Sequence, residues 1–293
     1  LSVDDHGAQY PVTVDPLVWL FMQKLRAMDA ANDARLGTSL AMTSDLVATG
    51  APGATTAGFT NAGAVYVFSI GSSSFALQGK LVAADPEISQ GFGSSLAISG
   101  DTIAVGTVNS TVAGKAGAGA VYVFVRSGGV WAQQAYIKAS NTEGGDRFGD
   151  SLALSGDTLA VGAPAEDSSA MGVGGDPANN GRQNSGAVFV FQRTGTTWAQ
   201  QAYLKSSTPD PEDRFGSSVA LDGDTLAVSA LGEDSSAVGI GGNQADNTAS
   251  ASGAVYVFLR TGTTWAQQAY VKASNTAADD RFGESLALSG DTL

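Results

Sequence analysis

The chain repeats itself, and this repetition constrains the fold more than any other feature of the sequence. Three segments are nearly identical: residues 131–149 (WAQQAYIKASNTEGGDRFG), 198–216 and 265–283. Each begins with tryptophan and ends in a Phe-Gly pair, whose phenylalanine lies 17 residues further on. With the same interval, five copies can be aligned on the anchors Trp19, Phe75, Trp131, Trp198 and Trp265. A regular period of this length predicts a stack of similar structural units.

The copies differ in length at one place. The anchors are spaced by 56, 56, 67 and 67 residues. The extra residues fall in a loop that spans 52–63 in the first copy and 164–186 in the third. The equivalent loop of the fourth copy, 231–253, is equally long. We therefore expect one scaffold that carries two long loops.

Each copy contains four short apolar segments separated by turn residues, which predicts four β-strands. In the third copy these segments are 151–155, 158–161, 186–191 and 198–205. The third segment is apolar at nearly every position, so both of its faces must be covered. No helical period separates the segments, which argues against parallel β-α-β layers. The sequence therefore predicts an all-β fold, a β-propeller of four-stranded antiparallel blades, with a β-sandwich as the alternative.

The first strand of each blade is expected to follow the Phe-Gly position. The predicted starts of these inner strands lie near residues 36, 92, 148, 215 and 282. A tight turn with an aspartate follows each of them, at Asp45, Asp101, Asp157, Asp224 and Asp291. In four of the five copies this aspartate follows a glycine, which suits a hairpin turn that needs a positive φ.

The order of Phe-Gly, Gly-Ala-Pro and Gly-Ala-Val-Tyr-Val-Phe resembles the FG-GAP repeat of integrin α-chain β-propellers, in the bacterial branch of that family. In the third copy it stands as Phe148-Gly149, Gly162-Ala163-Pro164 and the strand 186–191. Two copies depart from Gly-Ala-Pro, with Gly-Thr-Val at 106–108 and Ser-Ala-Leu at 229–231. The resemblance covers about residues 19–293, and it implies a propeller of the adhesion and ligand-binding kind.

Family propellers usually have seven blades, which need more residues than the 293 present. The sequence therefore predicts that residues 17–293 are four complete repeats and a partial one from a larger propeller. The alternative is a five-bladed ring that the N-terminal strands close. Residues 1–16 are expected to form a β-hairpin, which either ends an upstream domain or supplies closing strands.

The amino-acid composition excludes several common types of catalytic site. The chain has no cysteine and one histidine, His6, which lies before the repeats. Thiol nucleophiles, thiolate zinc sites and a Ser-His-Asp triad therefore lack parts. Gly149-Asp150-Ser151-Leu152 spells the signature of GDSL-type esterases, but Asp150 stands at a position that varies among the repeats. We therefore expect no enzyme activity.

Calcium is the candidate cofactor. Integrin-type repeats hold calcium in an Asp-rich loop between the first two strands, but here that connection is Ser-Gly-Asp-Thr, with one carboxylate. Calcium takes six to eight oxygen ligands, and the long loops offer such oxygens instead. The candidate ligands are Glu166, Asp167, Asp176, Asn179, Glu233, Asp234, Asp246 and Asn247. The alternative is that these residues cap turns within the loops.

The sequence thus predicts a non-enzymatic extracellular or cell-surface module, of bacterial origin, whose loops recognise a protein or glycan partner. The long loops 164–186 and 231–253 are the expected recognition face, since binding residues concentrate on loops held by a rigid scaffold. A net charge of −13 disfavours nucleic acid and anionic lipid as partners, and no membrane insertion is expected. The alternative is a structural spacer of a large exported protein, without a ligand of its own.

Overall fold

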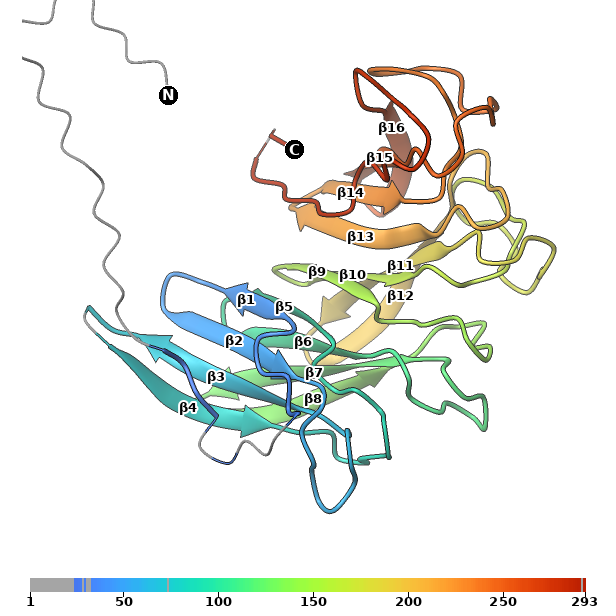
Figure 1. Ribbon diagram of the computed structural model, residues 1–293. Helices are drawn as coiled ribbons and strands as arrows, with labels where there is room; N and C mark the ends of the chain where they lie inside the picture. The colour runs from blue at the N-terminus through green and yellow to red at the C-terminus, as the bar shows by residue number, and fades with distance from the viewer. Residues whose placement is uncertain (1–23, 28, 30–32, 73, 291) are drawn as a thin grey trace, which may run out of the picture.

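The computed structural model describes the chain except for residues 1–23, 28, 30–32, 73 and 291. Within the described residues sixteen strands form four antiparallel sheets of four strands each, and no helix occurs. The sheets are stacked in an arc that does not close into a ring (Figure 1). The predicted all-β fold of four-stranded antiparallel blades is therefore confirmed. The predicted hairpin at 1–16, His6 and the anchor Trp19 lie outside the described residues.

Each blade is a meander whose strands pair in chain order. Blade 1 comprises β1 (Leu40–Met42), β2 (Leu46–Ala51), β3 (Ala64–Ile70) and β4 (Phe75–Leu81). Blade 2 comprises β5 (Ser95–Ser99), β6 (Thr102–Thr107), β7 (Ala120–Ser127) and β8 (Val130–Ile137). Blade 3 comprises β9 (Ser151–Ser155), β10 (Thr158–Ala163), β11 (Ala187–Thr194) and β12 (Thr197–Leu204). Blade 4 comprises β13 (Phe215–Asp222), β14 (Thr225–Ala230), β15 (Ala254–Thr261) and β16 (Thr264–Val271).

The first strand of every blade lies on the inner side of the arc, where β1, β5, β9 and β13 contact one another in succession. These strands begin at residues 40, 95, 151 and 215. The segment expected to start a fifth inner strand near 282 forms no strand within the described residues 282–290, because no neighbouring strand pairs with it there. Its side chains Leu286 and Leu288 nevertheless pack on the apolar face of blade 4.

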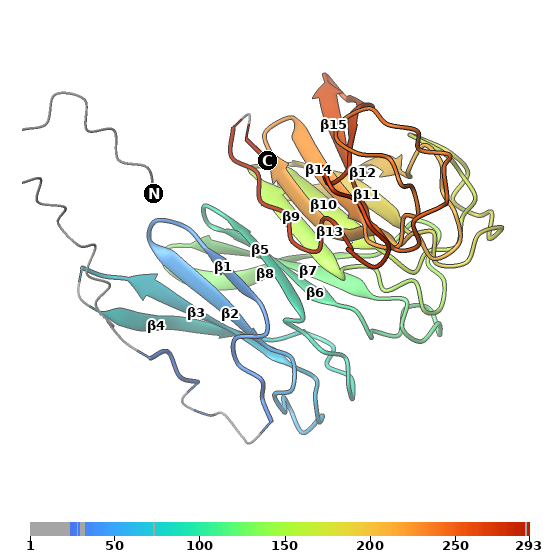
Figure 2. The same ribbon diagram turned by 45° about the horizontal axis from the view of Figure 1, so that its top comes forward.

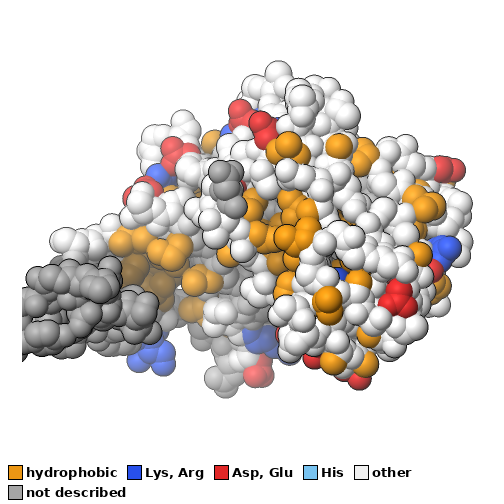
Figure 3. All heavy atoms as spheres, turned by 90° about the horizontal axis from the view of Figure 1, so that it is seen from above, with side chains coloured by type: hydrophobic (Ala, Val, Ile, Leu, Met, Phe, Trp, Pro, Cys, Tyr) orange, Lys and Arg blue, Asp and Glu red, His pale blue; other side chains and the backbone are white. Residues whose placement is uncertain are grey.

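The hydrophobic core lies between the blades. One cluster joins blades 1 and 2, a second joins blades 2 and 3, and a third joins blades 3 and 4. The second and third strands are buried over most of their length, as their two-sided apolar sequences require. Some apolar side chains stay at the surface, among them Leu40 and Met42 of β1, and apolar groups gather near the centre of the face seen in Figure 3. The described residues form no helix, and therefore none that is long and apolar enough to cross a membrane.

The phenylalanine of each Phe-Gly pair fills the junction between two blades. Phe92, Phe148 and Phe215 are fully buried. Each packs edge-on against two aromatic rings from the third strand of its own blade, at ring-centroid distances of 5.3–6.0 Å. Each also donates its backbone N–H to the preceding blade, as Phe92 does to the carbonyl of Ala62 at 2.8 Å. This one residue therefore contributes to the packing of both blades.

Glycines bring neighbouring blades into backbone contact. The first residue of the Gly-Ala-Pro position is Gly50, Gly106 or Gly162 in the first three blades. A Cβ added there would lie 2.0, 2.3 or 2.1 Å from the carbonyl oxygen of the next Phe-Gly glycine, so no side chain fits. The same carbonyl accepts a hydrogen bond of 2.5–2.7 Å from a serine of the preceding blade, Ser39, Ser95 or Ser151. The two glycine signatures of the repeat are thus the two sides of one contact.

At the other end of the blades, which carries the tight turns and is called the hairpin end here, arginines link successive blades. Each donates to the turn aspartate of its own blade at 2.6–2.7 Å: Arg126 to Asp101, Arg193 to Asp157 and Arg260 to Asp224. Each guanidinium also lies 5.2–5.8 Å from the ring of the anchor tryptophan. The same side chains reach the preceding blade, at Asp45, Thr102 and Thr158. The recurrence of the turn aspartate is explained by these contacts.

Gly162 should not accept a methyl group. In Gly162→Ala the new Cβ would approach the Gly216 carbonyl oxygen to 2.1 Å, so the junction between blades 3 and 4 has to open. Overpacking of this kind costs roughly 1–3 kcal/mol, and we expect the melting temperature to fall by about 5 °C. Gly79→Ala is the matched control, because its Cβ would meet only Trp131 Cδ1 at 3.4 Å. Equal melting temperatures of the two variants would contradict this account of the junction.

Candidate functional site

The end of the blades opposite the hairpin end, called the loop face here, carries the loops between second and third strands and the connections between blades. The loops are residues 52–63, 108–119, 164–186 and 231–253. Each connection hydrogen-bonds to the loop of the preceding blade, as Gly145 N does to Ala116 O at 3.0 Å and Glu212 N does to Gln183 O at 2.9 Å. Figure 2 shows these segments gathered on one side of the arc. The loop face is therefore a continuous surface rather than a set of separate loops.

A buried ion pair anchors the long loop of blade 3. Glu166, near the start of the loop, is 1% exposed, and Lys205, which follows β12, is fully buried. Glu166 Oε2 accepts from Lys205 Nζ at 2.9 Å, and Glu166 Oε1 accepts from the Tyr203 hydroxyl at 2.8 Å. Lys205 Nζ also donates at 2.7 Å to Ser185 Oγ, near the end of the loop. Both ends of the loop are thus held to the outer strand of the blade.

The long loop of blade 4 repeats this arrangement. Glu233 Oε2 accepts from Lys272 Nζ at 2.6 Å, and Glu233 Oε1 accepts from the Tyr270 hydroxyl at 2.7 Å. Lys272 Nζ donates to Ser252 Oγ at 2.6 Å. Both charged side chains are almost completely buried. Because both loops begin with Glu-Asp-Ser-Ser and end near a serine, and both adopt the same anchor, the anchor is a property of the 67-residue repeat.

Sequence reasoning missed the lysines of these anchors. Lysine recurs at the same repeat position in three copies, as Lys138, Lys205 and Lys272, whereas the glutamate occurs only where the loop is long. Lys138 belongs to a repeat with a short loop, and it is exposed. The joint occurrence of the glutamate and the longer loop is the sequence signal from which the ion pair could have been predicted.

The other candidate calcium ligands hold the loops together from within. Their side-chain oxygens accept backbone N–H groups at 2.7–3.0 Å: Asn184 N on Asp167, Ala178 N on Asp176, Gly181 N on Asn179, Ala251 N on Asp234 and Ser236 N on Asp246. Asn247 differs, since its Nδ2 donates at 2.9 Å to Oδ2 of Asp210, which lies in the connection between blades 3 and 4. Among the described residues no group of three or more His, Cys, Asp or Glu side chains is placed to hold a metal ion. Calcium binding stays a prediction, and the hydrogen bonds fit the turn-capping alternative.

Two buried aspartates precede the Phe-Gly pairs. Asp146 is 4% exposed and Asp213 is 2% exposed. Each accepts the backbone N–H of the residue three positions earlier, Glu143 at 3.0 Å and Asp210 at 2.7 Å. Burial, together with nearby carboxylates that include Glu166 and Glu233 of the loop anchors, raises the pKa of these carboxyls to about 7. At neutral pH these groups are therefore close to half protonated.

Ser151 of the Gly-Asp-Ser-Leu segment is part of a blade junction. Its hydroxyl donates to the Gly216 carbonyl at 2.7 Å, as the equivalent serines of blades 1 and 2 do at their own junctions. Asp150 pairs with Arg147 at 2.9 Å. The segment that resembles an esterase motif thus has a structural use in this fold.

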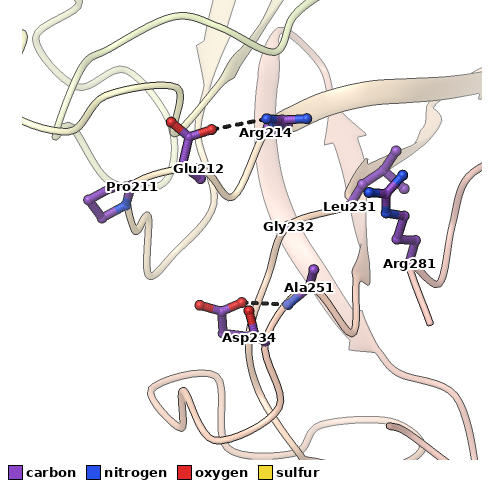
Figure 4. Close-up of a pocket in the computed structure, with 9 residues that line it drawn as sticks. Pro211, Glu212, Arg214, Leu231, Gly232, Asp234, Ala251 and Arg281 are labelled. Atoms are coloured by element: carbon purple, nitrogen blue, oxygen red, sulfur yellow. Dashed lines mark hydrogen bonds and ion pairs between the residues drawn. The ribbon is translucent and has the colours of Figure 1, made fainter. Parts of the chain in front are cut away.

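Open hollows lie at the blade junctions of the loop face. One of about 400 Å³ is lined by Arg147, Asn184 and Arg214, among others. The next, of about 270 Å³, is lined by Arg214, Leu231 and Arg281, among others, so the two hollows share Arg214. Figure 4 shows the charged side chains around the second hollow, with Glu212 paired to Arg214. Both hollows are open and have a lining of mixed polar and apolar groups, which suits recognition of a ligand surface better than enclosure of a small apolar molecule.

Comparison with known families gives one result. The model of the FG-GAP repeat matches residues 19–68, 75–124, 131–191, 198–258 and 265–293. Each match begins on one of the five repeat anchors, and together they cover most of the chain. No curated protein matches the chain. The likeness to integrin propellers and to their bacterial relatives stays a prediction.

Removing one partner of a loop anchor should be costly. Glu166→Ala leaves Lys205 buried without a counter-charge, and breaking a buried pair in this way costs about 3–5 kcal/mol. Chemical unfolding should show this loss, and the double variant Glu166→Gln, Lys205→Met should recover much of it. Lys138→Met is the matched control, since the exposed lysine has no such partner and its loss should be nearly neutral. A midpoint for Glu166→Ala equal to that of the control would refute the anchor.

The buried aspartates should make stability fall with rising pH. Because the folded pKa of Asp146 is about 7, above the unfolded value near 3.8, its contribution is complete below pH 4 and is lost up to about pH 7. Asp146→Asn should therefore be more stable than the unchanged protein at pH 8, by at most about 4 kcal/mol, and about equally stable at pH 4. Thermal melting of both proteins at the two pH values measures this difference. Asp280→Asn, at the exposed equivalent position, is the control and should show no such trend. Parallel pH profiles for both variants would exclude the effect.

Proposed function

Because the chain belongs to the FG-GAP repeat family, we propose that it is a recognition module that works outside the cell and binds a protein or glycan partner through its loop face. Propellers of this family are generally non-enzymatic, and repeats of this kind are typical of extracellular proteins. The chain also lacks cysteine, so no disulfide bond holds its blades together. The bacterial origin predicted from the sequence belongs to the same proposal.

The observation that carries the proposal is the buried anchor of each long loop. Blades 1 and 2 have short loops between their second and third strands, and both form complete four-stranded sheets. The longer loops of blades 3 and 4 are thus not needed to build a blade, yet each has its own buried Glu–Lys pair. A preformed loop loses little conformational entropy when it binds a partner, which favours affinity. A loop surface that is held in a fixed shape is useful for binding a partner, whereas a structural spacer does not need one.

The second candidate is a structural spacer in a larger exported protein. It is favoured by the links between successive blades, which occur at both ends: the glycine contacts on the loop side and the arginine contacts at the hairpin end. Such links couple each blade to its neighbour. A spacer of this kind would not depend on the sequence of the long loops.

A loop replacement separates the two candidates. Residues 165–185 are exchanged for 53–62, the corresponding stretch of blade 1, and both proteins are screened on arrays of glycans and extracellular proteins. Lys205 should then become exposed, as Lys138 is, and the blade should remain folded. We expect the unchanged protein to bind and the variant to lose at least tenfold in affinity. Binding by neither protein, or equally by both, would favour the spacer.

The same screen tests calcium as a cofactor. It is run with about 5 mM calcium and again with a chelator, since extracellular calcium modules bind at about 0.1–1 mM. Binding that depends on calcium would support the ligands predicted in the loops. Binding that is identical in both conditions would leave recognition intact and remove the calcium proposal.

A further inference from the structure

Four arginines on the loop face have an unfavourable backbone conformation. Arg35, Arg147, Arg214 and Arg281 occupy equivalent positions before Phe-Gly, or its counterpart, with φ of 50–60°. The remaining copy has Gly91 at this position, with φ of 70°. Glycine adopts this conformation without strain, whereas any other residue loses about 1–2 kcal/mol. The chain therefore carries arginine at sites where its own sequence shows that glycine fits.

Packing and ion pairing within the fold do not account for these arginines. Arg147 pairs with Asp150 and Arg214 pairs with Glu212, but both arginine side chains are more than half exposed, and such pairs contribute about 0–1 kcal/mol. Among the described residues the side chains of Arg35 and Arg281 have no partner. The arginines of the hairpin end differ, since each is bonded to aspartate and stacked on tryptophan.

The position of these arginines points to a ligand. Arg214 lines the hollow of about 400 Å³ together with Arg147, and the hollow of about 270 Å³ together with Arg281. Figure 4 shows Arg214 and Arg281 among the residues that line the second hollow, with Leu231 next to Arg281. A guanidinium presents five N–H donors in a planar fork, so Arg214 can keep Glu212 and still bind a second carboxylate.

We propose that the two hollows that share Arg214 each bind the carboxylate of a single acidic sugar, a uronic acid unit of a glycan. The inference rests on the proposed function and names the chemistry of its ligand. The hollows are lined by polar groups such as Asn184, Ser217 and Ser250, which match sugar hydroxyls, with Pro211 and Leu231 as small apolar surfaces. No deep apolar pocket is present in them for the anchoring side chain that a peptide would use.

The negative net charge of the protein disfavours binding of a glycan that carries many negative groups. The net charge is −13, so a ligand with many negative groups is repelled at long range. A single carboxylate experiences mainly the groups within a Debye length of about 8 Å, and the hollows hold carboxylates there as well as guanidinium groups. These carboxylates already have partners, since Asp150 and Glu212 are each paired with an arginine and Asp234 accepts the backbone N–H of Ala251. On the face seen in Figure 3, acidic and basic side chains are scattered and neither sign forms a large patch. Recognition of isolated carboxylates is the mode that this distribution permits.

The test uses two disaccharides that differ only in one group, one ending in glucuronic acid and one ending in glucose. Binding is followed by calorimetry and by ligand-observed NMR, at physiological salt. We expect the acidic sugar to bind at least tenfold more tightly than the neutral one. Equal binding of the two sugars, no binding of the acidic one, or preferential binding of an acidic peptide would overturn the assignment.

Arg214→Gly is the decisive variant, because it removes the guanidinium and relieves the positive φ, as Gly91 does in its own repeat. We expect the affinity for the acidic sugar to fall at least tenfold while the melting temperature stays equal or rises. Lys115→Gln, on the short loop of blade 2, removes an equal charge away from these hollows and should leave binding unchanged. Retained binding in Arg214→Gly, or a loss accompanied by a lower melting temperature, would overturn the role of Arg214.

This outcome is separable from that of the proposed function. If array binding depends on the long loop but the acidic sugar does not bind, the recognition module stands and only its ligand chemistry is wrong. If array binding is absent or independent of the loop, the recognition module itself fails.

Discussion

The close approach of one glycine to another across each blade junction determines the rest of the structure. A blade can stack on the next only where the Cα of the Gly-Ala-Pro glycine meets the carbonyl of the Phe-Gly glycine without an intervening side chain. That contact sets the separation at which Phe92, Phe148 and Phe215 fill the space between sheets. It also places the connection between blades against the preceding loop, which creates the loop face. The apolar cores between neighbouring blades are packed at this spacing.

The second constraint is electrostatic, and it acts differently at the two ends of the blades. At the hairpin end arginine, aspartate and tryptophan form exposed links that join neighbours at modest gain. On the loop face the charges of Glu166 and Lys205 are removed from water, where the pair holds the loop only because both partners are present. Asp146 and Asp213 lie near these anchors, and their pKa values are raised mainly by burial and less by the neighbouring carboxylates. Each long loop therefore depends on both partners of its buried Glu–Lys pair.

The repeat made most of the fold predictable. The period and the two-sided apolar strands favoured stacked four-stranded blades over a β-sandwich, because such a stack covers a strand like 186–191 on both faces and repeats with a regular period. The anchors of the loops were not predictable in the same way. The sequence indicated Glu166 as a candidate calcium ligand, because other polar residues lie close to it in the chain. Its actual partner, Lys205, lies 39 residues further along, after two further strands. Contacts over that distance depend on register and burial, which a local motif does not contain. The strain at Arg214 was equally hidden, since sequence alone does not give φ.

The paired attachment of each long loop has a consequence for how its sequence can change. Glu166 and Ser185 are both held by Lys205, so the stretch between them begins and ends at positions that do not depend on its own composition. Substitution within that stretch is therefore expected to alter the shape presented to solvent without loosening the sheet below. The arrangement separates the part of the repeat that must stay constant from the part that can diversify, as in an antibody variable domain, and two repeats of one chain could acquire different partners.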